Sequence, residues 1–161
     1  MRKKHEMSFS TKHRLYLFKG KKTFLSMTFK SPRHRKKAGT NAENELIHKF
    51  WENGWCCVRV AGSGSTKYPA PDLLAGNSHR KIVFEIKVVS STKKYFSNQE
   101  ILDLEYFAKT FGAEAWVGVQ FETKEWFFCP TTELDTTRTD NYVATLIKMK
   151  KSGFIFEEVI Q

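Results

Sequence analysis

Four residues, Glu43, Asp72, Glu85 and Lys87, have the types and spacing from which a metal-dependent catalytic site could be built. Carboxylates that lie close together repel one another and raise one another's pKa values unless a divalent cation holds them. Hard oxygen ligands of this kind suit Mg²⁺ or Mn²⁺, which keep bound waters and bind substrate phosphates. The metal can lower the pKa of a bound water, and a neighbouring lysine can orient that water or stabilise the charge that builds on a phosphate.

Each of these residues also has an ordinary structural explanation when it is taken alone. Glu43 can be the third residue of a helix capping box opened by Thr40. Asp72 can be a turn residue at the start of a strand, and Glu85 with Lys87 can be a surface ion pair on an edge strand. The catalytic interpretation therefore depends on the elements that bring the four together.

The first of these elements is a predicted helix from Thr40 to Gly54, with Thr40 as its N-cap and Asn53-Gly54 as its stop signal. At about 100° per residue, Glu43 falls in the middle of an apolar face. That face consists of Ala42, Leu46, Ile47, Phe50 and Trp51. A carboxylate within a buried stripe is costly unless a cation meets it, which favours a functional role for Glu43.

Three predicted strands, at residues 55–60, 72–75 and 81–89, carry the remaining candidates. In the third strand, side chains alternate between two faces, so that Glu85 and Lys87 share one face with Val83 and Val89. A second helix follows at 97–111, capped by Ser97 and Glu100 and ended by Gly112.

Two more strands, at 115–121 and 125–129, and a helix at 142–151 complete the predicted order of elements. This order predicts an α/β fold with a mixed β-sheet and helices packed on it. The apolar tail at 154–156 follows the last helix.

The composition places these elements in one basic, globular domain. The chain has 161 residues, 40% of them hydrophobic, and a formal net charge of +10, which favours an anionic partner. Residues 1–37 alone carry 13 Lys and Arg against one acidic residue, whereas the remainder is nearly balanced. We therefore expect a basic, flexible N-terminal arm at 1–35, followed by the catalytic domain at 36–161.

The cysteines and hydropathy indicate where such a protein works. Cys56 and Cys57 are adjacent and Cys129 is distant, so their spacing does not fit a structural zinc site. No run approaches the roughly 20 apolar residues of a membrane span. Reduced cysteines predict an intracellular, cytoplasmic protein, and the basic arm fits a nucleic acid better than an acidic protein surface.

At this point the residues resemble a known group of enzymes. Pro71-Asp72 followed by Glu85-Ile86-Lys87 resembles the PD-(D/E)xK signature of the restriction-endonuclease-like nucleases. Over about residues 36–145, the chain is similar in particular to the archaeal-type Holliday junction resolvases. The segments that carry this similarity are Lys36-Lys37-Ala38-Gly39, Ala42-Glu43-Asn44-Glu45-Leu46, Gly54-Trp55-Cys56-Cys57-Val58-Arg59, Gly62-Ser63-Gly64-Ser65, Asp72-Leu73-Leu74-Ala75-Gly76 and Phe107-Ala108-Lys109-Thr110-Phe111-Gly112.

The resemblance implies roles for individual residues. Glu43, Asp72 and Glu85 match the family's metal-binding carboxylates, together with the backbone carbonyl of Ile86, and Lys87 matches its catalytic lysine. Ser63 matches a serine near the scissile phosphate, although Ser65 is a near-equal candidate. The residues expected to contact DNA are Arg35, Lys36, Lys37, Arg59, Ser65, Lys67, Lys93 and Lys94.

The resemblance also implies a function. It predicts a restriction-endonuclease-like fold and a homodimer that uses Mg²⁺, or Mn²⁺ in its place, to hydrolyse two opposing strands of a four-way DNA junction. The dimer is expected to use the apolar surface around Trp116, Trp126 and Phe128, although these aromatics can equally be core residues. The loop and rim cations Arg80 and Arg138 are further candidates for contacting phosphates.

Two alternatives remain at this stage. A nuclease of the same fold can act on linear or otherwise branched duplexes, because fold does not determine substrate. A non-catalytic DNA-binding module with the same fold is the other, and the presence of all four catalytic candidates argues against it. The chain also differs from the family in its long N-terminal arm and in its balanced remainder.

Overall fold

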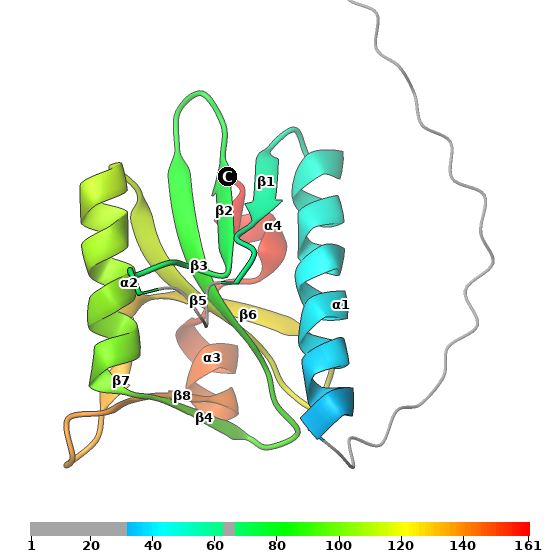
Figure 1. The fold of residues 1–161 in the computed structure, drawn as a ribbon. Helices are drawn as coiled ribbons and strands as arrows, with labels where there is room; N and C mark the ends of the chain where they lie inside the picture. The colour runs from blue at the N-terminus through cyan, green and yellow to red at the C-terminus, as the bar shows by residue number, and fades with distance from the viewer. Residues whose placement is uncertain (1–31, 63–66) are drawn as a thin grey trace, which may run out of the picture.

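The computed structural model describes residues 32–62 and 67–161, which form a mixed α/β domain (Figure 1). In chain order, its elements are α1 (Pro32–Glu52), β1 (Cys56–Arg59), β2 (Leu73–Gly76), β3 (Lys81–Val88), β4 (Lys93–Phe96), α2 (Asn98–Phe111), β5 (Glu114–Gln120), β6 (Trp126–Pro130), the 3₁₀ helix η2 (Thr131–Glu133), β7 (Asp135–Thr136), β8 (Tyr142–Thr145), α3 (Leu146–Ser152) and α4 (Phe156–Val159).

The main sheet has five strands in the order β1-β2-β3-β5-β6. Its central strands β3 and β5 are parallel, and the other neighbouring pairs are antiparallel. A second sheet has the order β4-β8-β7 and is antiparallel throughout. The α2 helix connects these sheets, since it follows β4 and leads into β5. The predicted mixed sheet flanked by helices is confirmed.

The two faces of β3 belong to different parts of the core. Ile82, Phe84 and Ile86 pack with residues of α1 and α4, including Leu46 and Phe156. The opposite face meets α2, where Val83 packs against Leu104 and Ala108. Figure 1 shows α1 and α2 flanking the strands of the main sheet. The alternation predicted for this strand is therefore confirmed, and it places Glu85 and Lys87 on the α2 side.

The α1 helix differs from its prediction at its N-terminal end. It begins at Pro32, not at Thr40. Proline suits the first helical position because its missing N–H is not needed there. The helix thus extends into the expected arm, of which residues 1–31 lie outside the described part of the chain. Because Thr40 lies inside the helix, it does not open a capping box with Glu43.

The segments around β4 and β8 are the other departures. Sequence patterns predict no strand at Lys93–Phe96 and a single helix over 142–151. The structure instead has β4 at the first site, and at the second the strand β8 followed by α3, with Thr145 as the helix N-cap. The four-residue strands β4 and β8 are stabilised by pairing with each other, which local periodicity does not reveal.

The α2 helix agrees with its prediction at both ends. The Ser97 side chain accepts a hydrogen bond from the Glu100 amide, and the Glu100 carboxylate accepts one from the Ser97 amide. Gly112 adopts the left-handed conformation that ends the helix. Within residues 32–62 and 67–161, no helix has the length and apolar character needed to cross a membrane.

Candidate active site

Asp72 is fixed at a bend immediately before β2. Its amide donates a hydrogen bond to the Phe84 carbonyl at 2.9 Å, and its carbonyl accepts one from the Val60 amide at 3.0 Å. The backbone of Asp72 is therefore held between the chain that follows β1 on one side and β3 on the other. Its carboxylate oxygen Oδ2 accepts a further hydrogen bond from the Ile86 amide at 2.9 Å, which directs the side chain along β3.

Glu85 and Lys87 lie on β3 beside this carboxylate. The Lys87 ammonium donates a hydrogen bond to Glu85, and its Nζ lies 3.9 Å from Oδ2 of Asp72. These side chains are largely buried, with 26% of Lys87 and 15% of Glu85 exposed. This arrangement is consistent with the sequence prediction that Asp72, Glu85 and Lys87 lie together.

Glu43 approaches from α1 and forms an ion pair with Arg59 of β1. Its side chain is 15% exposed, against 42% for Arg59. The buried residues of this part of α1 are Ala42, Leu46 and Phe50, whereas Trp51 is 55% exposed. Glu43 thus lies at the border of the buried face, not in its middle as the helical projection suggested.

The electrostatics link Glu43 to the residues on the strands. Burial raises the pKa of Glu43, the negative charge of Asp72 raises it further, and Arg59 opposes both effects. Burial and Asp72 likewise raise the pKa of Glu85 against the opposing charge of Lys87. Burial disfavours the charged form of Lys87, but attraction by Glu85 and Asp72 outweighs it and raises the lysine pKa.

Asp72 lies between the two glutamates and is coupled to both, so the three carboxylates supply hard oxygen donors of the kind that divalent cations prefer. The backbone carbonyl of Ile86 can add a fourth oxygen donor. The N–H and C=O groups of one strand residue point to the same side of the strand, and the N–H of Ile86 faces Asp72. Among the described residues, no three acidic, histidine or cysteine side chains are arranged around one ion. Glu43 and Glu85 turn toward Arg59 and Lys87 instead, so a change of side-chain conformation separates this arrangement from a metal site.

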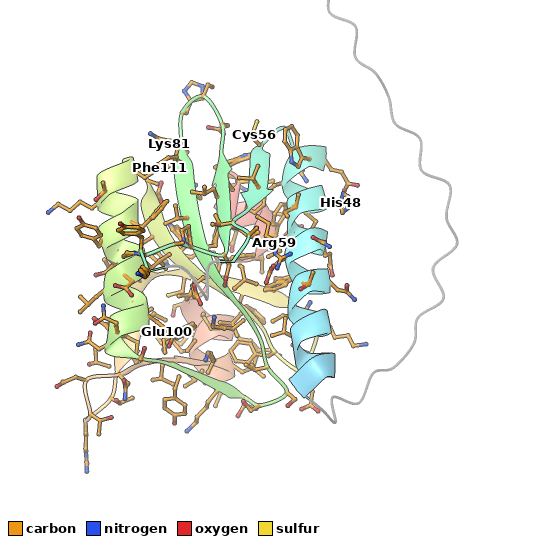
Figure 2. All side chains as sticks on the ribbon, viewed as in Figure 1. His48, Cys56, Arg59, Lys81, Glu100 and Phe111 are labelled. Carbon is orange, nitrogen blue, oxygen red and sulfur yellow. The ribbon has the colours of Figure 1, made fainter. Side chains whose placement is uncertain are left out.

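The side chains of four residues predicted to contact DNA at this site are described, namely Arg59, Lys67, Lys93 and Lys94. Arg59 borders it directly, as Figure 2 shows at the end of β1 facing α1. Lys67 and Lys93 are exposed, and Lys94 is half-buried. The remaining candidates lie outside what the structure describes: Ser63 and Ser65 entirely, and Arg35, Lys36 and Lys37 in their side chains.

Arg80 has a structural role instead of the phosphate contact expected for it. Its guanidinium makes two hydrogen bonds to the Glu114 carboxylate, at 2.7 and 2.8 Å, and a third to the Val159 carbonyl at 2.7 Å. The group also lies over the Trp116 ring. Arg80 therefore fastens the β2–β3 turn to β5 and α4, whereas Arg138 is exposed on the turn before β8.

The aromatics expected at a dimer surface are core residues. Trp116, Trp126 and Phe128 are at most 6% exposed, and Phe128 packs in the same cluster as Phe84. Among the described residues, large exposed apolar side chains lie on several elements, and three of them, Leu102, Tyr106 and Phe111, lie on α2.

Sequence patterns identify Glu100 only as a helix cap, and so miss its proximity to the site. Burial raises the pKa of its carboxyl, but the hydrogen bonds from Ser97 and the charges of Lys87 and Lys94 together outweigh burial and lower the pKa. The sequence signal that could have indicated this proximity is a glutamate in the first turn of a helix that directly follows a lysine-containing segment.

Comparisons with known proteins cover this whole domain. The family model described as archaeal Holliday junction resolvase (Hjc) matches residues 34–161. A crossover junction endodeoxyribonuclease Hjc from Archaeoglobus fulgidus is 38% identical over 102 residues, which are 63% of this chain and 75% of that protein. A protein of the same name from Methanocaldococcus jannaschii is 31% identical over 128 residues, which are 80% of this chain and 90% of that protein.

The fold is similar as well. The 1.6 Å structure of Archaeoglobus fulgidus Hjc, described as a Holliday junction resolvase from an archaeal hyperthermophile, matches with a TM-score of 0.71 and 32% sequence identity. The match covers 76% of this chain and 100% of that one.

Proposed function

Because the chain belongs to the archaeal Holliday junction resolvase family, we propose that it is a metal-dependent endonuclease that cuts four-way DNA junctions. The fold class and family expected from the sequence are confirmed by the match over residues 34–161 and by the similarity to a solved resolvase. The observation that carries the proposal to this chain is the cluster of Asp72, Glu85 and Lys87 on adjacent strands, with Glu43 electrostatically coupled to it.

In this proposal Glu43, Asp72, Glu85 and the Ile86 carbonyl would hold a divalent cation. Mg²⁺, with Mn²⁺ as a substitute, would lower the pKa of a bound water and stabilise charge on the scissile phosphate. Lys87 would orient the attacking water or donate to a phosphate oxygen, because its ammonium lies between Glu85 and Asp72. Ser63, or Ser65 in its place, would contact the phosphate from the loop before β2.

The DNA would lie across the rim of this site. Arg59, Lys67, Lys93 and Lys94 would meet phosphates of the DNA, and Arg35, Lys36 and Lys37 of α1 would add to this surface. Such contacts make binding salt-dependent without reading sequence. Branched DNA then supplies the specificity through its shape. A protein that acts on DNA in this way would work inside the cell.

A homodimer would place two such sites on one junction, as paired cleavage of opposing strands requires. The exposed apolar side chains of α2 support a dimer surface on that helix. Leu102 and Tyr106 are four residues apart and therefore share one face, away from the buried Ile101, Leu104 and Ala108.

The substrate is tested by incubating the protein and Mg²⁺ with a labelled synthetic four-way junction, beside the linear duplexes from which its arms are built. Paired cuts on opposing strands of the junction, with the duplexes left intact, are expected. Equal cleavage of the linear duplexes would assign the same active site to a nuclease with a different substrate. Binding of the junction without cleavage of either DNA would refute the enzymatic proposal.

A further inference from the structure

Lys94 lies in the smaller sheet, whose Phe96 packs with Val117 and Val119, the β5 residues paired with Glu85 and Lys87. In β4 it pairs with Ala144 and has Phe96 two residues beyond it, so these side chains share one face. Ala144 and Phe96 are buried, which makes this the inner face of the sheet. Lys93 and Tyr95 alternate onto the outer face and are exposed. Lys94 is thus directed inward, and its ammonium lies 5.2 Å from the centre of the Phe96 ring.

The charges that act on Lys94 include those of the catalytic candidates Lys87 and Glu85. Burial lowers its pKa and the like charge of Lys87 lowers it further, whereas Glu100 and Glu85 attract it. These two carboxylates act at longer range, since the described ion pairs join Glu85 to Lys87 and none includes Lys94. Lys94 therefore keeps its donors available while it is close to Lys87.

Glu100 supplies a negative charge that attracts both lysines. It lies in the first turn of α2, close to the end of β4, and Figure 2 shows it at that end of the helix. Its Oε2 atom accepts hydrogen bonds from the Ser97 amide at 2.8 Å and the Ser97 hydroxyl at 3.0 Å, so the cap holds the carboxylate in place. A fixed carboxylate offsets part of the cost of placing two like charges side by side.

An inward lysine beside a catalytic lysine, without an ion pair, suits an anion from outside the chain. A phosphate group carries the charge and acceptor oxygens that both ammonium groups require. We propose that Lys94 is a second phosphate-binding lysine of this active site and that Glu100 is a positioning residue that stabilises it beside Lys87. This inference deepens the proposed function and depends on DNA being the substrate.

The first test uses Lys94→Met, which removes the charge and keeps an apolar stem against Phe96. The control is Lys150→Met, which removes the charge of an exposed lysine on α3 that is not among the residues expected to contact DNA. We expect Lys94→Met to weaken binding of a four-way junction in EDTA by about tenfold and to reduce the log–log salt slope by about 0.9, as for one lost phosphate contact. Lys150→Met should change the dissociation constant by less than about threefold.

The second test uses Glu100→Gln, because glutamine can still complete the capping box with Ser97. Removing this negative charge should leave junction binding in EDTA as tight as before or tighter. The single-turnover cleavage rate at saturating protein should nevertheless fall by about tenfold, because the lysines are less well positioned. A purely structural role would instead lower the melting temperature, with rate and affinity falling together. Glu122→Gln, an exposed carboxylate on the β5–β6 turn, is the control.

The outcomes separate this inference from the proposed function. If the wild type cuts junctions and Lys94→Met binds and cleaves them as well as Lys150→Met does, the assignment of Lys94 alone would be overturned. Unchanged cleavage by Glu100→Gln would overturn the positioning role. A wild type that cuts no DNA would refute the proposed nuclease, while the binding comparison would still decide whether Lys94 contacts phosphate. If Lys94→Met fails to fold, Lys94→Gln replaces it and should show the same reduction of the salt slope, and an unchanged slope would overturn the assignment.

Discussion

Both the backbone and the carboxylate of Asp72 are held by hydrogen bonds within the site. Its main chain is hydrogen-bonded toward Val60 on one side and Phe84 on the other, and its side chain accepts from the Ile86 amide. These hydrogen bonds to the neighbouring strands consequently fix the position of the Asp72 carboxylate. Such preorganisation is what a catalytic site requires of its charged groups.

At the scale of residues, sequence patterns predicted the location of the strand candidates better than that of Glu43. The alternation of β3 fixes the face of Glu85 and Lys87, because a strand has only two faces. A helix offers a continuous range of directions, and the buried side of α1 depends on how β1 and α4 pack against it. Arg59, whose charge meets Glu43, could not be paired with it from sequence.

The Arg80–Glu114 pair gives a pH-dependent prediction at this scale. The hydrogen bonds from Arg80 lower the pKa of Glu114 in the folded protein. A lowered carboxyl pKa adds stability above its unfolded value of about 4.3, and this stability is lost as pH falls through the folded value. Since 43% of the Glu114 side chain is exposed, we expect Glu114→Gln to reduce the free energy of unfolding by only about 0.5 kcal/mol at pH 7.

Urea unfolding of the wild type and Glu114→Gln at a series of pH values measures this effect. The difference between the two proteins should shrink as pH falls below about 4. Glu133→Gln, an exposed carboxylate on η2, serves as the control. A difference that is constant with pH would show that the Glu114 charge is not what stabilises this contact.

At the scale of elements, β5 packs against its neighbours at Gly118. A Cβ atom at this position would lie 2.7 Å from Cδ1 of Ile86 and 3.0 Å from Cε1 of Phe128. Both distances are shorter than van der Waals contact, so the neighbouring side chains would have to move. Gly118→Ala is expected to reduce the free energy of unfolding by about 1–3 kcal/mol.

Thermal or urea unfolding of Gly118→Ala tests this packing. Gly39→Ala is the comparison, because a Cβ at Gly39 has only an ordinary contact of 4.0 Å with the Glu43 side chain. It should be neutral or slightly stabilising, since alanine is the better helix former. If Gly118→Ala proves equally neutral, the core around β3 is looser than the structure indicates.

The elements predicted correctly are those that carry their own local signals. The α2 helix has a capping box at Ser97 and a glycine at its end, and β3 has eight residues of clear alternation. The short strands β4 and β8 lack such signals and are defined by pairing with each other. Sequence patterns therefore missed the element that presents Lys94 to the active site.

At the scale of the whole molecule, the exposed face of α2 predicts how two copies associate. Replacing Tyr106, which is 65% exposed, by lysine would place a charge in the proposed apolar interface. We expect Tyr106→Lys to shift the protein from dimer to monomer in sedimentation equilibrium. Ile147→Lys, at an 83% exposed position on α3, is the matched control and should remain dimeric. A dimeric Tyr106→Lys protein would place the interface elsewhere.

The basic N-terminal segment gives a second prediction at this scale. Removing residues 1–31 keeps α1 intact and deletes most of the positive charge that precedes the domain. We expect the truncated protein to bind four-way junctions with a shallower salt dependence, since each lost phosphate contact reduces the log–log slope by about 0.9. An unchanged slope in a salt titration would show that this segment does not contact DNA.

The central claim is that the Glu43, Asp72, Glu85 and Lys87 cluster cuts DNA junctions, and Glu85→Gln tests it most directly. The variant keeps the size of the side chain and removes the buried charge that pairs with Lys87. The measurement is single-turnover cleavage of a labelled four-way junction in Mg²⁺, together with junction binding in EDTA, with Glu122→Gln as the control. We predict that Glu85→Gln binds the junction like the wild type but loses cleavage by a factor of about 100 or more. Cleavage at the wild-type rate would contradict the assignment of this cluster as the active site.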